Sequence, residues 1–345
     1  MRMPSLAEVQ NPLTVVQLLW CGQGMTALIE IYNDGVAKAE ADFLGLVNCG
    51  GDSVDAQQAL DYITAKVAAR HLRLLNLVVL TRLDASHISL LGELGDRLQS
   101  IGARVMDVFS AGGRNDIPDS VRKFLASLRY QPQGVAFVSE GQSSYSRPGL
   151  LSWISEHNGT YFRILASNRD SFVLVVETYR FSVVMPGELT PGIMEDTRKL
   201  GSLKGLLPPV VALVLPQDTA LATAVRNHLS SGSAAGDAEW ELITWFAGEI
   251  SPANIGVSAG PQNAFHHPIA QVIELFSANL QKEAPHTYVT YVLPTRGDSA
   301  KNFSGWIAKP TEYGIRSTVA ELGGQATYLP IEYKFTLRPA PIEEA

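Results

Sequence analysis

The stretch LNLVVLTRLDASHISL at residues 75–90 decides the fold, because an almost continuous apolar run leads directly into a polar turn. The apolar part, residues 75–81, predicts a central strand that is buried on both faces. A helix is predicted to follow over 89–101. The turn between them carries four side chains that are able to do chemistry: Arg82, Asp84, Ser86 and His87.

Outward from this stretch, the sequence predicts alternating strands and helices. Upstream, we expect strands at 15–20, 26–32 and 43–48 and a helix at 54–70. Downstream, we expect strands at 104–109, 161–165, 171–178, 180–185, 210–215, 240–245 and 255–258, and helices at 120–130, 195–199, 221–229 and 268–279. Loops are expected at 141–148 and 230–236.

This order predicts an α/β protein in which sheets are covered by helices in layers. We expect a single domain over residues 1–345. Its core should span about residues 12–290, and residues 291–345 should form a strand-rich extension at the C-terminus.

The composition excludes several classes of protein. The 345 residues are 46% hydrophobic, which supplies a core and excludes a chain that is disordered throughout. The formal charge is −7, from 34 acidic and 27 basic residues, which disfavours a dominant nucleic-acid surface. Two cysteines exclude a disulfide scaffold and predict a reducing compartment. Without a long apolar run or a signal-peptide pattern, we expect a cytoplasmic protein with no membrane span.

Gly22, Gly24 and Ala27 fit the G-x-G-x-x-A pattern of dinucleotide-binding proteins. That pattern works only when a helix begins directly behind the glycines and holds the pyrophosphate at its N-terminus. Here TALIEIYNDG follows at 26–35, which predicts a strand and a hairpin turn. The sequence therefore disfavours a dinucleotide site and predicts a tight turn between two strands.

Several motifs, taken in order along the chain, resemble the metallo-β-lactamase-fold domain of the competence protein ComEC. LLWCGQGMTALI at 18–29 resembles the family's D-V-G-Q-G-D-A opening, and VNCGG at 47–51 resembles its I-D-x-G-G turn. TRLDASHISL at 81–90 stands at the family's metal motif, T/S-H-P-D-A-D-H-I-x-G. The remaining matches are NRDSFVL at 168–174, MPGEL at 185–189, VVALVL at 210–215, and SAGPQN at 258–263 followed by His267-Pro268.

The resemblance implies a metallo-β-lactamase-like αββα four-layer sandwich with one or two divalent metals, usually zinc, that activate a water. Most of the ligand positions have changed, however. Arg82 stands at the first ligand histidine and Ser86 at an aspartate, while Glu188 replaces the bridging aspartate. Gln217 and Asp218 stand where the last ligand histidine is expected. An arginine is a permanent cation that cannot bind a metal ion.

Asp84 and His87 remain at ligand positions, and two interpretations of them stay open. In the first, they belong to an ordinary turn and helix start, and Arg82 pairs with Asp84 or Glu188 and so replaces the charge of the metal. In the second, Asp84 and His87 hold one zinc or manganese ion together with Glu188 and Asp218.

Further positions also allow two interpretations. His267 either begins a helix with Pro268 or, as the resemblance implies, lies at the rim of the site and meets a substrate phosphate. Met25, like Trp20, replaces a supporting aspartate and is expected to fill the floor of the pocket. Cys21 and Cys49 lie at strand ends that face the site, as buried thiols, as a thiol pair or as ligands of a soft metal.

Two functions from different classes follow. The first is a catalytically degenerate, ComEC-like protein that needs no cofactor and acts as a binding or regulatory component of a multi-protein bacterial system, with a protein partner. The alternative is a divergent metal-dependent hydrolase that acts on phosphodiesters of nucleic acid or nucleotides, with Arg82 or His267 stabilising phosphate charge. A third hypothesis is a sensor in which Arg82 binds a small anion.

Overall fold

A computed structural model describes most of the chain up to residue 257 and short segments beyond it. The described residues are 12–19, 21, 24–51, 56–113, 117–128, 135–145, 153–178, 181–215, 221, 223–225, 227–228, 234–257, 272, 275–276, 278–279, 290–291, 315–317, 319–322, 325–328 and 331–336.

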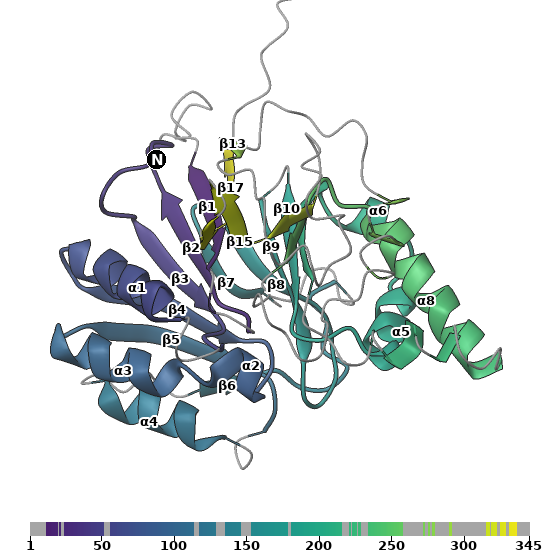
Figure 1. The fold of residues 1–345 in the computed structure, drawn as a ribbon, viewed down its shortest axis with the longest axis horizontal. Coiled ribbons are helices and arrows are strands. Elements are labelled where there is room, and N and C mark those ends of the chain that lie inside the picture. Colours follow the sequence, from purple (N-terminus) through teal and green to yellow (C-terminus); the bar gives the residue numbers. More distant parts are fainter. Residues whose placement is uncertain are drawn as a thin grey trace, which may run out of the picture.

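Two large sheets form the centre of the protein (Figure 1). The first sheet has eight strands, in the spatial order β13 (Thr290–Tyr291), β17 (Ile331–Thr336), β1 (Leu13–Leu18), β2 (Ala27–Tyr32), β3 (Phe43–Val47), β4 (Leu74–Leu80), β5 (Arg104–Ser110) and β6 (Val135–Phe137). The second has seven, in the order β14 (Ile315–Ser317), β12 (Ile255–Val257), β11 (Val210–Leu215), β10 (Ser182–Pro186), β9 (Phe172–Glu177), β8 (Thr160–Ser167) and β7 (Trp153–His157). A separate hairpin joins β15 (Val319–Leu322) to β16 (Gln325–Tyr328).

Each sheet begins with antiparallel strands and continues with parallel ones. β1, β2 and β3 pair antiparallel, after which β4, β5 and β6 each join in parallel. In the second sheet, β7 to β10 pair antiparallel, and β11 and β12 follow in parallel. Parallel neighbours require a crossover. The helices supply it: α1 (Gln57–Ala69), α2 (Ala85–Ile88), α3 (Leu91–Ser100) and α4 (Asp119–Ser127) in the first half, and α5 (Pro191–Lys199), α6 (Leu203–Leu206) and α8 (Ala234–Ile250) in the second.

Among the described residues, three large hydrophobic cores separate four layers. Between α1, α3, α4 and the first sheet lies a core that includes Leu60, Leu94 and Val78. The second core fills the space between the two sheets, and the third joins the second sheet to α5, α6 and α8. Figure 1 shows the two groups of helices on opposite outer faces. The expected αββα four-layer sandwich is therefore confirmed.

The buried strand over 75–81 is confirmed as β4, with the polar turn directly behind it. One predicted strand is wrong: residues 240–245 belong to the helix α8, which also includes the end of the loop expected at 230–236. The aromatic and β-branched residues of WELITW favoured a strand, but Leu242, Ile243, Phe246 and Ile250 fall at helical spacing and pack on the second sheet.

The C-terminal strands lie beyond the predicted core of about 12–290 and still pair with it. β17 pairs with β1 over six residues on each strand, and β14 pairs with β12. The boundary at 290 stays a prediction. None of the helices that the structure describes has the length and apolar character needed to cross a membrane.

Phe162 tests the core between the sheets, because its side chain is fully buried and its ring packs on Phe43 of the other sheet at 5.5 Å between centroids. Phe162→Ala removes most of a buried ring, and we expect it to lower the free energy of unfolding by about 3–5 kcal/mol. Met106→Ala, at a position that is 52% exposed, should change it by less than about 0.5 kcal/mol. Equal losses in urea unfolding for the two variants would contradict this packing.

Candidate functional site

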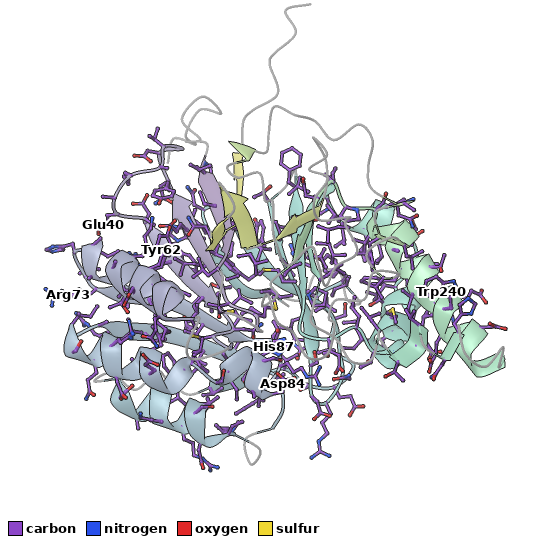
Figure 2. The ribbon with its side chains drawn as sticks, viewed as in Figure 1. Glu40, Tyr62, Arg73, Asp84, His87 and Trp240 are labelled. Atoms are coloured by element: carbon purple, nitrogen blue, oxygen red, sulfur yellow. The ribbon has the colours of Figure 1, made fainter. Side chains whose placement is uncertain are left out.

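The turn that follows β4 forms the centre of the candidate site. Asp84 occupies the position before α2 with an extended backbone, but its carboxylate does not cap that helix. The carboxylate instead contacts neighbouring side chains, as described below. Figure 2 shows Asp84 and His87 between the two halves of the sandwich.

Backbone hydrogen bonds fix this turn against two loops from other strands. The amide of Met25 donates to the carbonyl of Ser86 at 2.9 Å, and the amide of Cys49 donates to the carbonyl of His87 at 2.7 Å. Gly50 lies so close that a Cβ there would be 2.2 Å from the Ser86 oxygen. A side chain at that position would force the backbones apart, which explains the glycine.

Arg82 lies between two carboxylates. Its Nε is 2.8 Å from Oδ2 of Asp84, and its Nη1 is 2.9 Å from Oε1 of Glu188. The side chain of Arg82 is 23% exposed and that of Glu188 is 12% exposed, so the second ion pair is largely screened from water. The ion pairs expected between Arg82 and an acidic neighbour are therefore both present. One guanidinium faces two carboxylates, which leaves one net negative charge among these three groups.

Asp84 also accepts hydrogen bonds from the turn itself. Its Oδ1 lies 2.5 Å from Nδ1 of His87 and 2.7 Å from Oγ of Ser86. Burial acts to raise the pKa of Asp84, but the hydrogen bonds from His87 and Ser86 and the charges of His87 and Arg82 together lower that pKa to about 2. Asp84 is thus a firmly ionised carboxylate that is already occupied by protein partners.

The floor of the site is neutral. Asn48 is buried, with Nδ2 donating to Oγ1 of Thr81 at 2.8 Å and to Sδ of Met25 at 3.3 Å. Its Oδ1 accepts from the amide of Thr81 at 2.8 Å. Cys21 and Cys49 are buried and not joined by a disulfide, and burial raises the pKa of the Cys49 thiol well above its ordinary value. A protonated, buried thiol is an inert side chain rather than a nucleophile.

Among the described residues of the site, two buried polar atoms have no hydrogen-bond partner, Nε2 of His87 and Oγ of Ser171. The side chain of His87 is 3% exposed. Ser171 forms an isolated antiparallel bridge with Arg82, so it lies on the other side of the same site. These atoms are the unused hydrogen-bonding capacity of the site.

A divalent metal does not fit the described residues. Among them, no group of three or more histidine, cysteine, aspartate or glutamate side chains comes together as metal ligands. The guanidinium of Arg82 lies against both remaining carboxylates and would repel a metal cation. Structural zinc takes four ligands, and catalytic zinc takes three with a water.

Some predicted site residues lie outside the described part of the chain. These are Gln217, Asp218 and His267, together with Trp20. Their roles stay predictions. The structure brings together Arg82, Asp84, Ser86, His87 and Glu188, which come from two turns about one hundred residues apart.

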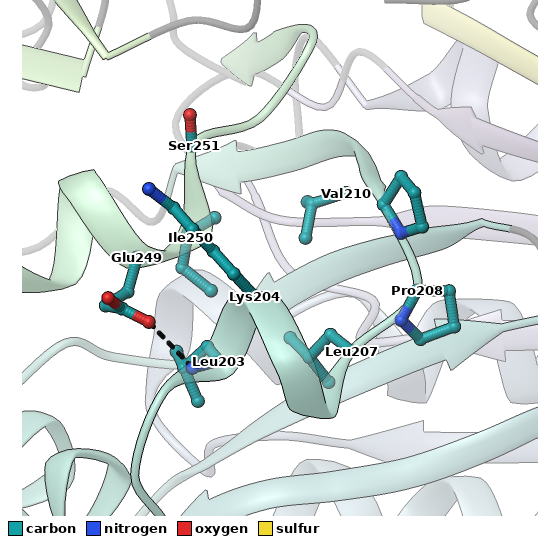
Figure 3. A pocket seen from close by; sticks show the side chains of 9 residues that line it. Leu203, Lys204, Leu207, Pro208, Val210, Glu249, Ile250 and Ser251 are labelled. Atoms are coloured by element: carbon teal, nitrogen blue, oxygen red, sulfur yellow. Dashed lines mark hydrogen bonds between the residues drawn. The ribbon is translucent and has the colours of Figure 1, made fainter.

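A pocket of about 300 Å³ lies at the opposite end of the second sheet (Figure 3). It opens beside Val210 at the start of β11, whereas Glu188 follows the end of the parallel strand β10. Apolar residues line most of it: Leu203, Leu207, Pro208, Pro209, Val210 and Ile250. The carboxylate of Glu249 accepts hydrogen bonds from the amide of Leu203 at 2.7 Å and from Oγ of Ser202 at 3.0 Å, and these bonds connect α8 to the start of α6. Its place in the fold separates this pocket from the chemistry of the candidate site.

The sequence analysis missed Asn48 and Ser171 as parts of the site. Asn48 was visible only as the residue that stands at the aspartate of the I-D-x-G-G turn. Its left-handed backbone, with φ of 56°, suits asparagine better than most residues. Ser171 was visible only as the serine of the NRDSFVL match at 168–174, because its bridge to Arg82 depends on how the two sheets meet.

Comparison with solved structures finds proteins of the metallo-β-lactamase fold. The metallo-β-lactamase fold protein YhfI from Bacillus subtilis is 11% identical, and the match covers 88% of this chain and 96% of YhfI with a TM-score of 0.42. Human tRNase Z, short form, is 13% identical over 72% and 92%, with a TM-score of 0.40. The diiron β-hydroxylase CmlA from Streptomyces venezuelae is 11% identical over 94% and 54%, with a TM-score of 0.40. A scan of protein-family models and a search of curated proteins found no match.

Asp84→Asn tests the electrostatics of the turn. The folded pKa of about 2 lies below the ordinary 3.8, so ionised Asp84 stabilises the fold above about pH 4, and this contribution disappears as pH falls toward 2. Because the side chain is 38% exposed, we expect a contribution of only about 1 kcal/mol. Urea unfolding at pH 7 and pH 2.5 should show that the variant's deficit shrinks in acid. Asp119→Asn is the control, because the Asp119 side chain is 99% exposed in its ion pair with Arg122. A deficit for Asp84→Asn that does not change with pH would contradict the assignment.

Asn48→Asp tests the neutral floor. The change removes both donated hydrogen bonds and buries a carboxylate, so we expect a loss of about 2–4 kcal/mol in the free energy of unfolding at pH 7. The loss should decrease at pH 5, where the buried acid takes up a proton. Asn168→Asp is the matched control, because Oδ1 of Asn168 accepts from the amides of Asp170 and Ser171 and a carboxylate also does so. A pH-independent loss, or equal losses for both variants, would contradict this account.

Proposed function

We propose that this chain is a catalytically degenerate protein on a metallo-β-lactamase-like scaffold, and that it acts by binding a partner. The observation that carries the proposal is the guanidinium of Arg82 between the carboxylates of Asp84 and Glu188. A metal-dependent hydrolase of this fold needs a metal ion that lowers the pKa of its bound water. Arg82 supplies a positive charge at the site but no position at which a water is activated.

The pattern of what is kept and what is lost supports the same function. The close backbone approaches at Gly24, Gly50 and Gly187 keep the shape of the turns around the site. The side chains that would bind a metal have changed at Arg82 and Ser86. A chain that keeps the backbone shape of a site but not its metal ligands is suited to binding a partner through its surface.

The ion pairs also disfavour the sensor hypothesis. An incoming phosphate or carboxylate would have to displace either Asp84 or Glu188 from Arg82. Both carboxylates lie against the guanidinium, and their charges oppose the approach of an anion to it. The same argument weakens the suggestion that Arg82 stabilises the phosphate charge of a substrate.

The alternative, a divergent metal-dependent hydrolase of phosphodiesters, has one observation in its favour. Nε2 of His87 is buried without a partner, and a histidine nitrogen of this kind is a good metal ligand. The alternative would also need Asp218, which lies outside the described residues. It requires zinc or manganese, whereas the favoured proposal requires no cofactor.

The proposed setting follows from the resemblance to ComEC-like domains. We propose a protein partner within a multi-protein bacterial system, in the cytoplasm. The net charge of −7 favours a protein partner over long nucleic acid.

Metal content is the decisive measurement. Untagged protein, purified without chelator or added metal, should contain far less than one equivalent of zinc, manganese or iron by mass spectrometry. Added zinc and added EDTA should both leave the melting temperature unchanged, because a metal stabilises only a fold that binds it. Near-stoichiometric metal, or a rise of several degrees with zinc, would overturn the proposal in favour of the hydrolase.

The double variant Arg82→His with Ser86→Asp is the positive control. It changes RLDASH at 82–87 to HLDADH and supplies two further ligands to the turn. In EDTA, we expect the double variant to melt at a lower temperature than the wild-type protein, because Asp84 and Glu188 have lost the cation of Arg82. Added zinc should raise its melting temperature again. A double variant that stays indifferent to zinc would show that these two positions do not explain the loss of metal.

A further inference from the structure

The two sheets are joined by main-chain hydrogen bonds beside the candidate site. The amide of Phe172, at the start of β9, donates to the carbonyl of Thr81, at the end of β4, at 3.0 Å. Next to it, Arg82 and Ser171 form their isolated antiparallel bridge. The amide of Gly112 donates to the carbonyl of Arg169 at 3.1 Å. Each of these contacts links a residue of the first half to a residue of the second.

The turn behind β10 closes on the same place. Gly187 lies so near the first sheet that a Cβ there would be 2.5 Å from the carbonyl oxygen of Thr81. The amide of Gly187 donates to the carbonyl of Phe172 at 3.1 Å. Glu188 follows directly, so its carboxylate reaches toward the first sheet where β4 ends.

Arg82 is the side chain that spans this junction. Its Nη1 binds Glu188 of the second half, and its Nε binds Asp84 of the first half. Each of the two nitrogens has its own acceptor, which fixes the planar guanidinium in one orientation. The ligand positions that the family uses come from both halves, so a metal ion in this site would join them as well.

We propose that Arg82 cross-links the two sheets at the candidate site, in the structural place of a metal ion. This inference rests on the proposed function, since it concerns a chain that folds without metal. The cation is built into the polypeptide, so the junction forms as soon as the chain folds and does not depend on metal supply. Arg82 is in this role a positioning residue, and the partner-binding form of the protein is the metal-free one.

Hydrogen exchange measures the junction directly, because the amide of Phe172 donates across it to Thr81. The amide of Gly187 donates to Phe172 within the second sheet, and it reports on the turn that carries Glu188. In Arg82→Met, we expect both amides to exchange at least roughly tenfold faster than in the wild-type protein, relative to the amide of Leu60 within α1. Arg82→Lys keeps the charge but offers a single ammonium to two carboxylates, so its exchange rates should lie between those of the wild-type protein and of Arg82→Met. EDTA should leave exchange in the wild-type protein unchanged.

Arg97→Met is the matched control. The side chain of Arg97 is 24% exposed, close to the 23% of Arg82, and it also pairs with two carboxylates, those of Asp61 and Glu93. Its ion pairs join α1 to α3 on the outside of the first sheet. Arg97→Met should therefore leave the exchange rates of the Phe172 and Gly187 amides unchanged. Relative to Leu60, these rates should stay the same or fall, because Leu60 lies in α1, which Arg97 contacts.

A double-mutant cycle supplies the second measurement. The effects of Arg82→Met and Glu188→Gln on exchange at Phe172 should be strongly non-additive, because each variant breaks the same contact. If Arg82→Met does not fold, Arg82→Lys and Glu188→Gln carry the test. Additive effects, or a uniform increase at all amides in Arg82→Met, would overturn the cross-link. Faster exchange of the wild-type protein in EDTA would do so too, since a metal would then hold the junction.

The two proposals fail in different ways. Bound metal in the wild-type protein contradicts the proposed function, whatever the exchange data show. Unchanged exchange in Arg82→Met, in a protein that contains no metal, contradicts only the cross-link and leaves the degenerate function standing.

Discussion

The contact of one guanidinium with carboxylates from both halves of the sandwich organises the candidate site. Arg82 leaves the end of the buried strand β4 and meets Glu188 behind β10, while Asp84 holds it from its own turn. Breaking one side of such a pair leaves a poorly hydrated charge, which costs far more than the pair gains over apolar side chains. This contact joins the turn that carries Asp84 and His87 to the turn that carries Glu188.

The layers of the fold were largely predictable, because they follow from local patterns. The continuous apolar run of β4 and the alternation in β2 each predict a strand without knowledge of tertiary contacts. The error at 240–245 has a physical reason. A short apolar segment with aromatic residues fits a strand or a buried helix face equally well, and only packing on the second sheet decides between them. Strands as short as β6 carry too few residues for a pattern.

The candidate site was predictable only in part. The pairing of Arg82 was expected only through the resemblance, which places Asp84 and Glu188 around the position of Arg82. The neutral hydrogen bonds of Asn48 were not predictable, because they depend on Met25, just before β2, and on Thr81, just after β4. The orphaned atoms of His87 and Ser171 also arise from how the two sheets meet rather than from any motif.

The amide of Asn48 and the guanidinium of Arg82 have a consequence for how this site tolerates substitution. The amide nitrogen of Asn48 donates hydrogen bonds to the sulfur of Met25 and the hydroxyl of Thr81, while Arg82 forms ion pairs with the carboxylates of Asp84 and Glu188. A change at either Asn48 or Arg82 leaves buried groups of the site without their partners, which costs stability before any second change can compensate. The residues around Asn48 and Arg82 are therefore a mutually dependent set, and we expect them to change together rather than one at a time.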